Sequence, residues 1–553
     1  MTKSAFVLLI PAFAFVTAAL PLRAAEHGFA ATVNPLATQA ALGAMKAGGN
    51  AVDGAIAAAV MLGVVDQHNS GIGGGLFMLI RSPDGTFAAI DGREMAPAAA
   101  TRGMFIRDGQ PDPKLAQEGA LAAGVPGWLA ALDQAASAFG KLPLARPLRE
   151  AAQVAEDGFK PDPGFAERRK NMAQALGRHP ETAAVLLAPL NDGKLKMTDL
   201  AASYRHIADG GISWFYGGPF AEKTETWMKA NGGLMTAADL KNYQVKRREP
   251  LRSTYRGYDI VGFPPPSSGG VHVAEILNIL ENFDLKSMGD GSPDFIHVVT
   301  EAMKPAFADR AFWLGDPDFS KVPRGLIDSA YAKTLAQKID RAKVTPVPAH
   351  GDPPAAGTDV FSKHTTHFSV TDSDGWSVAC TATINNTWGS LVTIPGTGIL
   401  LNNEMDDFSV QPGVPNSFGL VGGEANAVAP GKRPLSSMSP TIVQKDGQLV
   451  LVIGAAGGPT IITQVLLGVV RTIDFGRTPQ EALAGPRFHH QWQPDALRIE
   501  RDVPAATRAE LEKRGHILNV VPAMGVSQAI ARAADGTFTG AADPRAHGSA
   551  AGF

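Results

Sequence analysis

The sequence predicts an α/β fold in which strands from both halves of the chain share one sheet. Apolar residues at helical spacing dominate residues 36–64 and much of 120–345. After residue 365 the pattern changes to the apolar–polar alternation that is typical of strands. Residues 346–364 lie between these regions, are rich in Pro, Gly and Ala, and have no periodicity, which predicts an exposed linker. Because strands are expected on both sides of it, the linker is predicted to interrupt one domain and not to separate two.

Composition supports a folded protein with a large core. Hydrophobic residues make up 45% of the 553 residues and charged residues 19%, which excludes a disordered chain. The formal net charge of −3 lacks the basic excess of a nucleic-acid-binding protein, so no nucleic-acid partner is expected. A single cysteine, Cys380, excludes an internal disulfide and a Cys-rich zinc or iron–sulfur site.

Residues 1–25 have the pattern of a secretory signal peptide. Lys3 precedes the apolar run AFVLLIPAFAFVTAAL, and small residues at Ala24 and Ala25 mark the expected cleavage site. Cleavage there would remove Lys3, Arg23 and no acidic residue, which changes the net charge from −3 to −5. The alternative is a permanent membrane anchor, but the run is short for a span and contains Pro11. We expect an exported protein without a membrane anchor, and its lack of disulfides suits a bacterial periplasm.

The elements are expected in the following order. Residues 36–64 form two Ala-rich helices with a break at Gly48-Gly49, and the glycine loop at 71–75 enters an apolar strand that is followed by a second strand near residues 86–91. Further helices are expected in the segments ALAAGVPGWLAALDQAASAF, VHVAEILNILENF, AYAKTLAQKID and PTIITQVLLGVVRTI. Strands are expected in YRGYDIVGFPPP, QLVLVIGA and RFHHQW, and a hairpin is expected in THFSVTDSDGWSVACTATI.

Several apparent motifs carry little information. GIGGG at residues 71–75 fails the dinucleotide pattern because Leu76 stands where its third glycine would fall. The adjacent His489 and His490 would point to opposite faces of a strand, so they make a poor metal pair. Cys380 lies within an apolar strand and is expected to be a small buried residue, not a nucleophile.

Thr365, directly after the linker, is a candidate nucleophile. A threonine hydroxyl needs an adjacent base, and a cut before Thr365 would create an α-amine that titrates near pH ~8. The plain alternative is a pair of β-branched residues, Thr365 and Thr366, that begin a strand. If DSDG forms a hairpin turn, Thr365 pairs within about one residue of Thr383, and Asn385 follows close by.

Other candidates fit the binding of an amino-acid group. Gly457-Gly458 end an apolar strand, where backbone N–H groups can approach an oxyanion, although a tight turn is the plain alternative. Arg93, Asp406-Asp407 and Ser436-Ser437 offer a guanidinium, carboxylates and hydroxyls. Separately these residues are more often surface pairs or caps, but together they match the carboxylate and ammonium of an α-amino acid.

These residues lie in long segments that resemble the bacterial γ-glutamyltransferases, also called γ-glutamyl transpeptidases or glutathione hydrolases. The similarity covers nearly the whole chain after residue 25, in order and at family-like spacing. The segments are GGNAVD, IDGREMAPAAAT, PPPSSGG, ILNILENFD, LGDPDF, TTHFSV, GILLNNEMDDFS, LVGGEANAV, KRPLSSMSPTIV and GPRFHHQW.

The resemblance implies a four-layer αββα sandwich of the N-terminal-nucleophile hydrolase type, with strands from two subunits in one fold. The chain would consist of a signal peptide (1–25), a large subunit (26–364) and a small catalytic subunit (365–553), because the family cuts itself before the residue that matches Thr365. By the same resemblance, Thr365 attacks γ-glutamyl amides such as glutathione, and water or an amino-acid or peptide acceptor resolves the ester. No metal or organic cofactor is implied. The resemblance also assigns roles to the remaining site residues. Thr383 would hydrogen-bond the nucleophile, and Gly457 and Gly458 would form the oxyanion hole. The α-carboxylate would be bound by Arg93, Ser436 and Ser437, and the α-amino group would be bound, or its pocket shaped, by Asn385, Glu404 and Asp407.

The chain departs from the family pattern at three places. Glu404 stands where many bacterial members have Gln, and Phe418 stands where well-known ones have a Tyr that hydrogen-bonds across the pocket. GAAGGPTI replaces the more usual GSPGGSRI around the oxyanion glycines.

Two alternative functions stay open at this point. A related acylase would use the same machinery on glutaryl or polyglutamyl amides, and a glutaryl amide lacks the α-amine and α-carboxylate. A non-enzymatic exported binding protein would leave the chain uncut.

Overall fold

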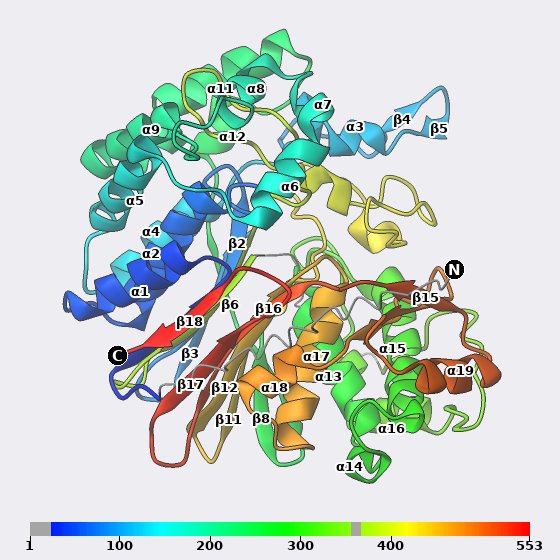
Figure 1. Cartoon of the computed structure of the whole chain (residues 1–553). Helices are drawn as coiled ribbons and strands as arrows, with labels where there is room; N and C mark the ends of the chain where they lie inside the picture. The colour runs from blue at the N-terminus through cyan, green and yellow to red at the C-terminus, as the bar shows by residue number, and fades with distance from the viewer. Residues whose placement is uncertain (1–23, 355–365) are drawn as a thin grey trace, which may run out of the picture.

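The computed structural model describes residues 24–354 and 366–553, and these form four layers. Two β-sheets pack face to face in the centre, and helices cover the outer face of each sheet (Figure 1). This is the αββα arrangement that the family resemblance implied, with helices and strands contributed by both sides of the linker. The predicted signal peptide up to residue 23 and the segment 355–365 lie outside the described residues.

The first sheet joins strands from both sides of the linker. Its order is β18-β1-β9-β10-β2-β3-β6. The strands are β1 (Gly28–Thr32), β2 (Gly75–Arg81), β3 (Phe87–Gly92), β6 (Lys246–Arg248), β9 (Thr366–Asp372), β10 (Ser377–Thr383) and β18 (Ser549–Gly552). The predicted hairpin is confirmed, since β9 and β10 are antiparallel with Thr366 opposite Ala382. β1, β2, β3 and β6 precede the linker, so the linker interrupts one sheet.

The second sheet also mixes the two parts of the chain. Its order is β17-β16-β12-β11-β8-β7, with only β7 and β8 from before the linker. The strands are β7 (Leu251–Tyr255), β8 (Tyr258–Gly262), β11 (Thr441–Lys445), β12 (Gln448–Ala456), β16 (Val526–Arg532) and β17 (Phe538–Ala542). Smaller sheets contain β4 (Ile106–Arg107) with β5 (Gln110–Pro111), and β13 (Phe488–His489), β14 (Leu497–Glu500) and β15 (Leu518–Val521).

The contact between the two sheets is close and mostly apolar. Phe77 of the first sheet packs against Phe263, which follows β8, with ring centroids 4.4 Å apart and the rings tilted by 33°. His367 of β9 is buried there and hydrogen-bonds Thr381 and Ser369, and burial lowers the pKa of its imidazole to about 3. A Cβ added at Gly454 of β12 would lie 2.3 Å from that ring, so the absence of a side chain at Gly454 lets the sheets approach.

Helices from the N-terminal part of the chain cover the first sheet. α2 is buried along its whole length, which explains its nearly continuous Ala and Val sequence, and Asn50 caps its N-terminus in a capping box with Asp53. The helices of this layer and its extension are α1 (Pro35–Lys46), α2 (Ala51–Val65), α3 (Lys114–Gln117), α4 (Trp128–Phe139), α5 (Ala145–Asp157), α6 (Pro163–Asn171), α7 (Ala173–Leu176), α8 (Pro180–Leu186), α9 (Thr198–Gly210), α10 (Ser213–Tyr216), α11 (Pro219–Ala230) and α12 (Ala237–Lys241).

A second group of helices covers the second sheet. α13 and α15 come from before the linker and pack against each other, and α13 also packs against α17, which follows the linker. The helices are α13 (Ser268–Leu280), α14 (Leu285–Met288), α15 (Pro293–Trp313), α16 (Ser329–Ala336), α17 (Thr460–Ile473), α18 (Pro479–Ala484) and α19 (Ala505–Lys513). Short 3-10 turns occur at Ala120–Ala122, Arg324–Ile327, Glu404–Asp407 and Glu424–Asn426.

Most element predictions are confirmed, with one correction. RFHHQW contains only the two-residue strand β13, so His489 lies in the strand and His490 follows it. Cys380 is fully buried in β10, and burial raises the pKa of its thiol, as expected of an unreactive core cysteine. Residues 346–354 form no helix or strand and none of them is buried, which agrees with an exposed linker. Among the described residues, no helix has the length and apolar character of a membrane span.

Candidate active site

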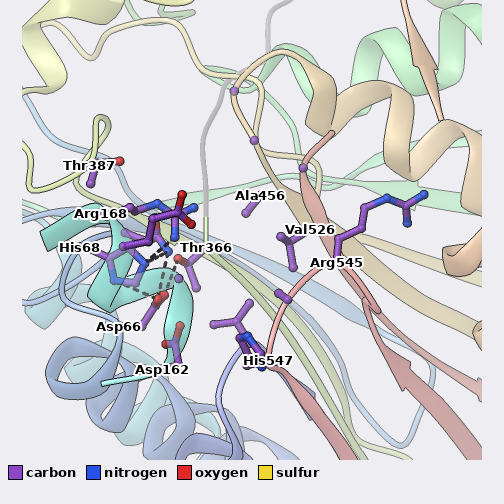
Figure 2. A pocket seen from close by; sticks show the side chains of 18 of the residues that line it. Asp66, His68, Asp162, Arg168, Thr366, Thr387, Ala456, Val526, Arg545 and His547 are labelled. Carbon is purple, nitrogen blue, oxygen red and sulfur yellow. Dashed lines mark hydrogen bonds and ion pairs between the residues drawn. The ribbon is translucent and has the colours of Figure 1, made fainter. Parts of the chain in front are cut away.

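A cavity of about 760 Å³ opens at the start of β9. Thr366, the first described residue after the linker, lines it together with Asn385, Gly457 and Gly458 (Figure 2). Thr365 directly precedes Thr366 in the sequence but lies outside the described residues. The cavity therefore contains the candidate oxyanion glycines and the residue next to the candidate nucleophile.

The glycine loop between β12 and α17 has a backbone that side chains would strain. Gly457 and Gly458 have φ angles of 133° and 60°. A Cβ at Gly457 would lie 2.7 Å from the Thr460 hydroxyl, and one at Gly458 would lie 2.8 Å from the Phe418 ring. Because the loop leads into the N-terminus of α17, its N–H groups lie where a negative charge is favoured.

Arg93 lies at the centre of a buried cluster of charges. The Arg93 Nη1 donates to Glu404, and its Nη2 donates to the Asp407 carboxylate at 2.8 Å. Glu94 lies 3.5 Å from Nη1, and all four side chains are fully buried. The Arg93 Nε donates to the Pro434 carbonyl at 3.3 Å, two residues before Ser436. A guanidinium and carboxylates thus meet beside the predicted serine pair.

The cluster holds more acidic than basic groups. Burial raises the pKa of Glu94 to about 7 although Arg93 opposes the shift. Burial also raises the pKa of Glu404, and the neighbouring Glu94 and Asp407 carboxylates add to the effect. The second oxygen of Glu404 has no hydrogen-bond partner among the described residues. An ammonium group of a ligand would favour the ionised forms of these carboxyl groups.

The serine pair and the polar residues after β10 lie around this cluster. Ser436 is fully buried, and its hydroxyl has no partner among the described residues. The Ser437 hydroxyl accepts a hydrogen bond of 3.5 Å from Arg310. Thr383, at the end of β10, accepts a 2.7 Å hydrogen bond from the backbone N–H of Asn385. Asn385 donates in turn to the carbonyl of Asn403, which precedes Glu404.

The segment Val414–Leu420 covers the charged cluster. Asn416 donates to Asp407 at 3.2 Å, and the Ser417 hydroxyl donates to Asp406. Phe418, one of the departures from the family pattern, lies against Gly458 and lines the cavity. Phe carries no hydroxyl, so its side chain contributes no hydrogen bond in the cavity.

The structure thus divides the predicted site residues into two neighbouring groups. Asn385, Gly457 and Gly458 line the large cavity. Thr383 and the predicted ligands of the amino-acid group are buried next to it and do not line it; these are Arg93, Glu404, Asp407, Ser436 and Ser437.

The sequence reasoning missed several polar residues of the cavity, among them Asp66, His68 and Arg168. Asp66 accepts a hydrogen bond of 3.3 Å from the Thr366 hydroxyl and one of 2.9 Å from Asn69 (Figure 2). The Nε2 of His68 lies 3.2 Å from the Arg168 guanidinium, which can only donate, so Nε2 accepts. Burial and Arg168 lower the pKa of His68 well below its usual range, so this imidazole is neutral. For Asp66 and His68 the available signal was a polar run, DQHNS, directly between the apolar C-terminal part of α2 and a glycine loop.

Asp66 makes the stability of the protein dependent on pH. Burial raises its pKa to about 7. The folded protein therefore holds a proton that the unfolded chain has lost, and stability falls as the pH rises from about 4 to about 7. We expect Asp66→Asn to raise the melting temperature, and more so at about pH 8 than at about pH 5. Asp446→Asn, in the exposed turn between β11 and β12, is the control and should change neither value. An equal gain at both pH values would contradict the assignment.

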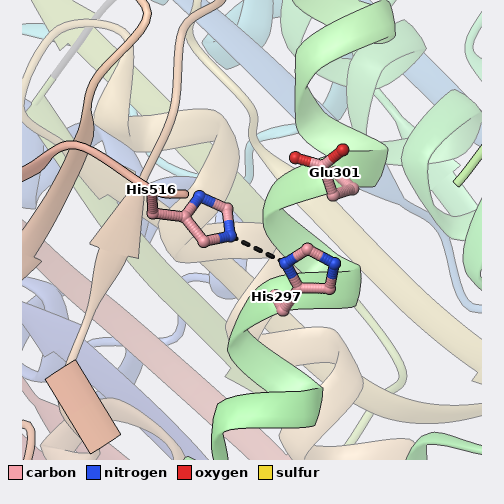
Figure 3. A group of neighbouring side chains, drawn as sticks. All are labelled: His297, Glu301 and His516. Carbon is pink, nitrogen blue, oxygen red and sulfur yellow. Dashed lines mark hydrogen bonds between the residues drawn. The ribbon is translucent and has the colours of Figure 1, made fainter. Parts of the chain in front are cut away.

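A second cluster of potential ligands lies on the far side of the second sheet. His297, Glu301 and His516 are buried within reach of one another (Figure 3). The two histidines hydrogen-bond each other at 2.8 Å, and Glu301 pairs with the Lys304 ammonium at 3.0 Å. The Lys304 charge repels a cation and the donor atoms already have partners. The cluster instead holds residues 340–345, because His297 contacts the Asp340 carbonyl and Glu301 accepts the Thr345 N–H.

Comparison with known proteins decides the family. The gamma-glutamyltranspeptidase family model matches residues 37–553. The chain belongs to the gamma-glutamyltranspeptidase family. It is 47% identical over 532 residues to the glutathione hydrolase proenzyme of Escherichia coli strain K12, covering 95% of this chain and 91% of that protein. The family and the enzyme class predicted from the sequence are thereby confirmed.

Other members of the gamma-glutamyltranspeptidase family and its structural relatives include acylases. The acylase ACY 1 proenzyme of Pseudomonas sp. strain SE83 is 40% identical over 540 residues, with 95% of this chain and 93% of that protein covered. Among solved structures, the cephalosporin acylase from Bacillus halodurans matches with a TM-score of 0.87 and 28% identity over 99% of both chains. Helicobacter pylori gamma-glutamyltranspeptidase matches with a TM-score of 0.57 and 38% identity, covering 59% of this chain and 95% of that one. The fold agrees with the four layers described above.

Proposed function

We propose that this enzyme is a γ-glutamyltransferase with glutathione hydrolase activity that cuts itself before Thr365. The observation that carries the substrate class is the buried contact of Arg93 with Glu404 and Asp407 beside Ser436. Guanidinium and hydroxyl groups suit an α-carboxylate, and carboxylates suit an α-ammonium. A γ-glutamyl group carries both at its far end, whereas a glutaryl group carries only the carboxylate.

In the proposed reaction, the Thr365 hydroxyl attacks the carbonyl of the γ-amide. Its proton passes to the α-amine of the same residue, which becomes free when the chain is cut. The backbone N–H groups of Gly457 and Gly458 stabilise the oxyanion, and Thr383 hydrogen-bonds the nucleophile. The α-amine then returns the proton to the leaving amine, and a γ-glutamyl ester forms on Thr365. Water or the amine of an acceptor amino acid or peptide attacks this ester, which restores the hydroxyl and releases glutamate or a new γ-glutamyl compound.

The binding roles follow the charges. Arg93, Ser436 and Ser437 hold the α-carboxylate. Asn385, Glu404 and Asp407 hold the α-ammonium or shape its pocket. Because the segment Val414–Leu420 covers this cluster, its opening would admit the donor. Phe418 then contacts the bound acyl group only through apolar surface.

The mature protein would consist of two subunits from one precursor. We propose a signal peptide at residues 1–25, a large subunit at 26–364, a small subunit at 365–553, and export to the periplasm. The mixing of strands from both segments within each sheet supports a cut that leaves the two pieces held together.

The substrate class can be tested with donors that differ only at the far end of the acyl group. The enzyme is assayed on γ-glutamyl and glutaryl anilides that share the same leaving amine. One hydrogen-bonded charged group contributes about 1.5–3 kcal/mol, so we expect kcat/KM to favour the γ-glutamyl anilide by ~10- to 100-fold. Equal values, or a preference for the glutaryl anilide, would contradict the proposal and favour an acylase.

A further inference from the structure

Arg310 of α15 is a buried arginine that the proposed mechanism does not use. Only 3% of it is exposed. Its Nε donates to the Ser268 hydroxyl at 3.1 Å, and its Nη2 donates to the Ser437 hydroxyl at 3.5 Å. Burial lowers the pKa of its guanidinium to about 10, so it is still charged at neutral pH.

The partners of Arg310 differ from those of the other deeply buried arginines. Arg93, Arg433, Arg471 and Arg487 each form an ion pair with a carboxylate. Among the described residues, Arg310 forms no such pair, and both of its hydrogen bonds go to neutral hydroxyls. The Asp407 carboxylate attracts this guanidinium electrostatically, but no carboxylate among the described residues hydrogen-bonds it. A buried charge without an ion pair is costly, so this position favours an anion that arrives from outside.

The surroundings of Arg310 are also arranged for an anion. Ser268 begins α13, and its hydroxyl donates to the Ser436 carbonyl at 2.6 Å, so the positive end of this helix lies beneath the serine pair. The Ser436 hydroxyl is buried without a partner among the described residues. A cavity of about 10 Å³, room for roughly one water, lies between Arg310 and Asp407.

We propose that Arg310 is a specificity-determining positioning residue, which orients Ser437 and supplies a second positive charge for the α-carboxylate of the donor. Arg93 already pairs with two acidic side chains in the structure, so its charge is only partly available to the carboxylate of a ligand. Arg310 adds a positive charge on the Ser437 side of the pocket. The enzyme therefore selects donors by their α-carboxylate through two arginines. This inference deepens the proposed function and rests on it.

The test measures inhibition by small ligands, because inhibition does not require turnover of the ligand. L-glutamate carries both α groups, 4-aminobutyrate lacks the α-carboxylate, and glutarate lacks the α-amine. We expect Arg310→Met to weaken inhibition by L-glutamate and glutarate about tenfold or more and to leave inhibition by 4-aminobutyrate within about twofold. For a γ-glutamyl anilide, KM should rise more than kcat falls. Arg310→Lys retains the charge and should recover most of the L-glutamate affinity.

Arg471→Lys controls for the loss of a buried arginine. Arg471 lies in α17 and pairs with Asp290 away from the cavity. We expect the Arg471→Lys variant to have a lower melting temperature and an unchanged preference for L-glutamate over 4-aminobutyrate. If Arg310→Met weakens inhibition by all three ligands equally, or by none of them, Arg310 has a merely structural role and this inference fails. If the unaltered enzyme itself does not prefer L-glutamate to 4-aminobutyrate, the proposed γ-glutamyl function fails instead.

Discussion

Thr365→Ala is expected to remain a single uncut chain and to lose hydrolysis of γ-glutamyl amides by on the order of 10⁴-fold or more. Alanine has no hydroxyl, so neither the cut nor the acyl ester can form. Gel electrophoresis of the purified variant reports the cut, and release of the leaving amine from a γ-glutamyl anilide reports turnover.

Thr365→Ser distinguishes the loss of the nucleophilic hydroxyl from a defect in folding. Serine keeps the hydroxyl and the α-amine, so we expect this variant to cut itself and to turn over more slowly than the unaltered enzyme. A cooperative melting transition of Thr365→Ala at a temperature close to that of the unaltered enzyme would exclude misfolding as the cause. Normal self-cleavage by Thr365→Ala would contradict the assignment of the nucleophile.

Replacement of Arg93 is the second change expected to have a large effect. Arg93→Gln leaves Glu94, Glu404 and Asp407 without their shared cation, and the loss of one partner from a buried ion pair costs about 3–5 kcal/mol. We expect kcat/KM for a γ-glutamyl anilide to fall on the order of 10²-fold or more. Arg93→Lys keeps the charge but not the planar fork, so its activity should lie between that of Arg93→Gln and that of the unaltered enzyme.

Arg487→Lys is a matched control for Arg93→Lys. Arg487 is also buried and pairs with Asp543, outside the proposed glutamyl pocket. If Arg487→Lys lowered the preference for γ-glutamyl over glutaryl donors as much as Arg93→Lys does, the effect would come from stability and not from recognition. A preference that survives in Arg93→Lys but is lost in Arg487→Lys would contradict the binding role of Arg93.

Local patterns in the sequence predicted the parts of the fold that depend on local physics. The apolar–polar alternation around DSDG predicted the hairpin of β9 and β10, and the Ala-rich run predicted α1 and α2. A break flanked by strands predicted that both segments share a sheet, which the order of the first sheet confirms. Gly457 and Gly458 were predicted to allow a close backbone approach, and their positive φ angles explain why glycine is needed.

The site contacts depend on side chains that lie far apart in the sequence. The resemblance identified Arg93 and Glu404, but no local pattern predicts a direct contact between two residues that lie 311 positions apart in the sequence. Asp66 and Arg310 were missed because an acidic residue at the end of a helix, or an arginine within one, is usually a surface charge. Only the packing of α2 beside β9, and of α15 beneath the serine pair, gives these residues their burial and partners.

The central claim is that the chain cuts itself before Thr365 and carries the γ-glutamyl group on that residue. Mass spectrometry of the purified protein, quenched during turnover of a γ-glutamyl anilide and then digested, tests both parts in one sample. We expect two fragments, the smaller beginning at Thr365, with the mass of one γ-glutamyl group added to the peptide that contains Thr365. An uncut chain that still releases the leaving amine, or a γ-glutamyl group on any other peptide, would contradict the account.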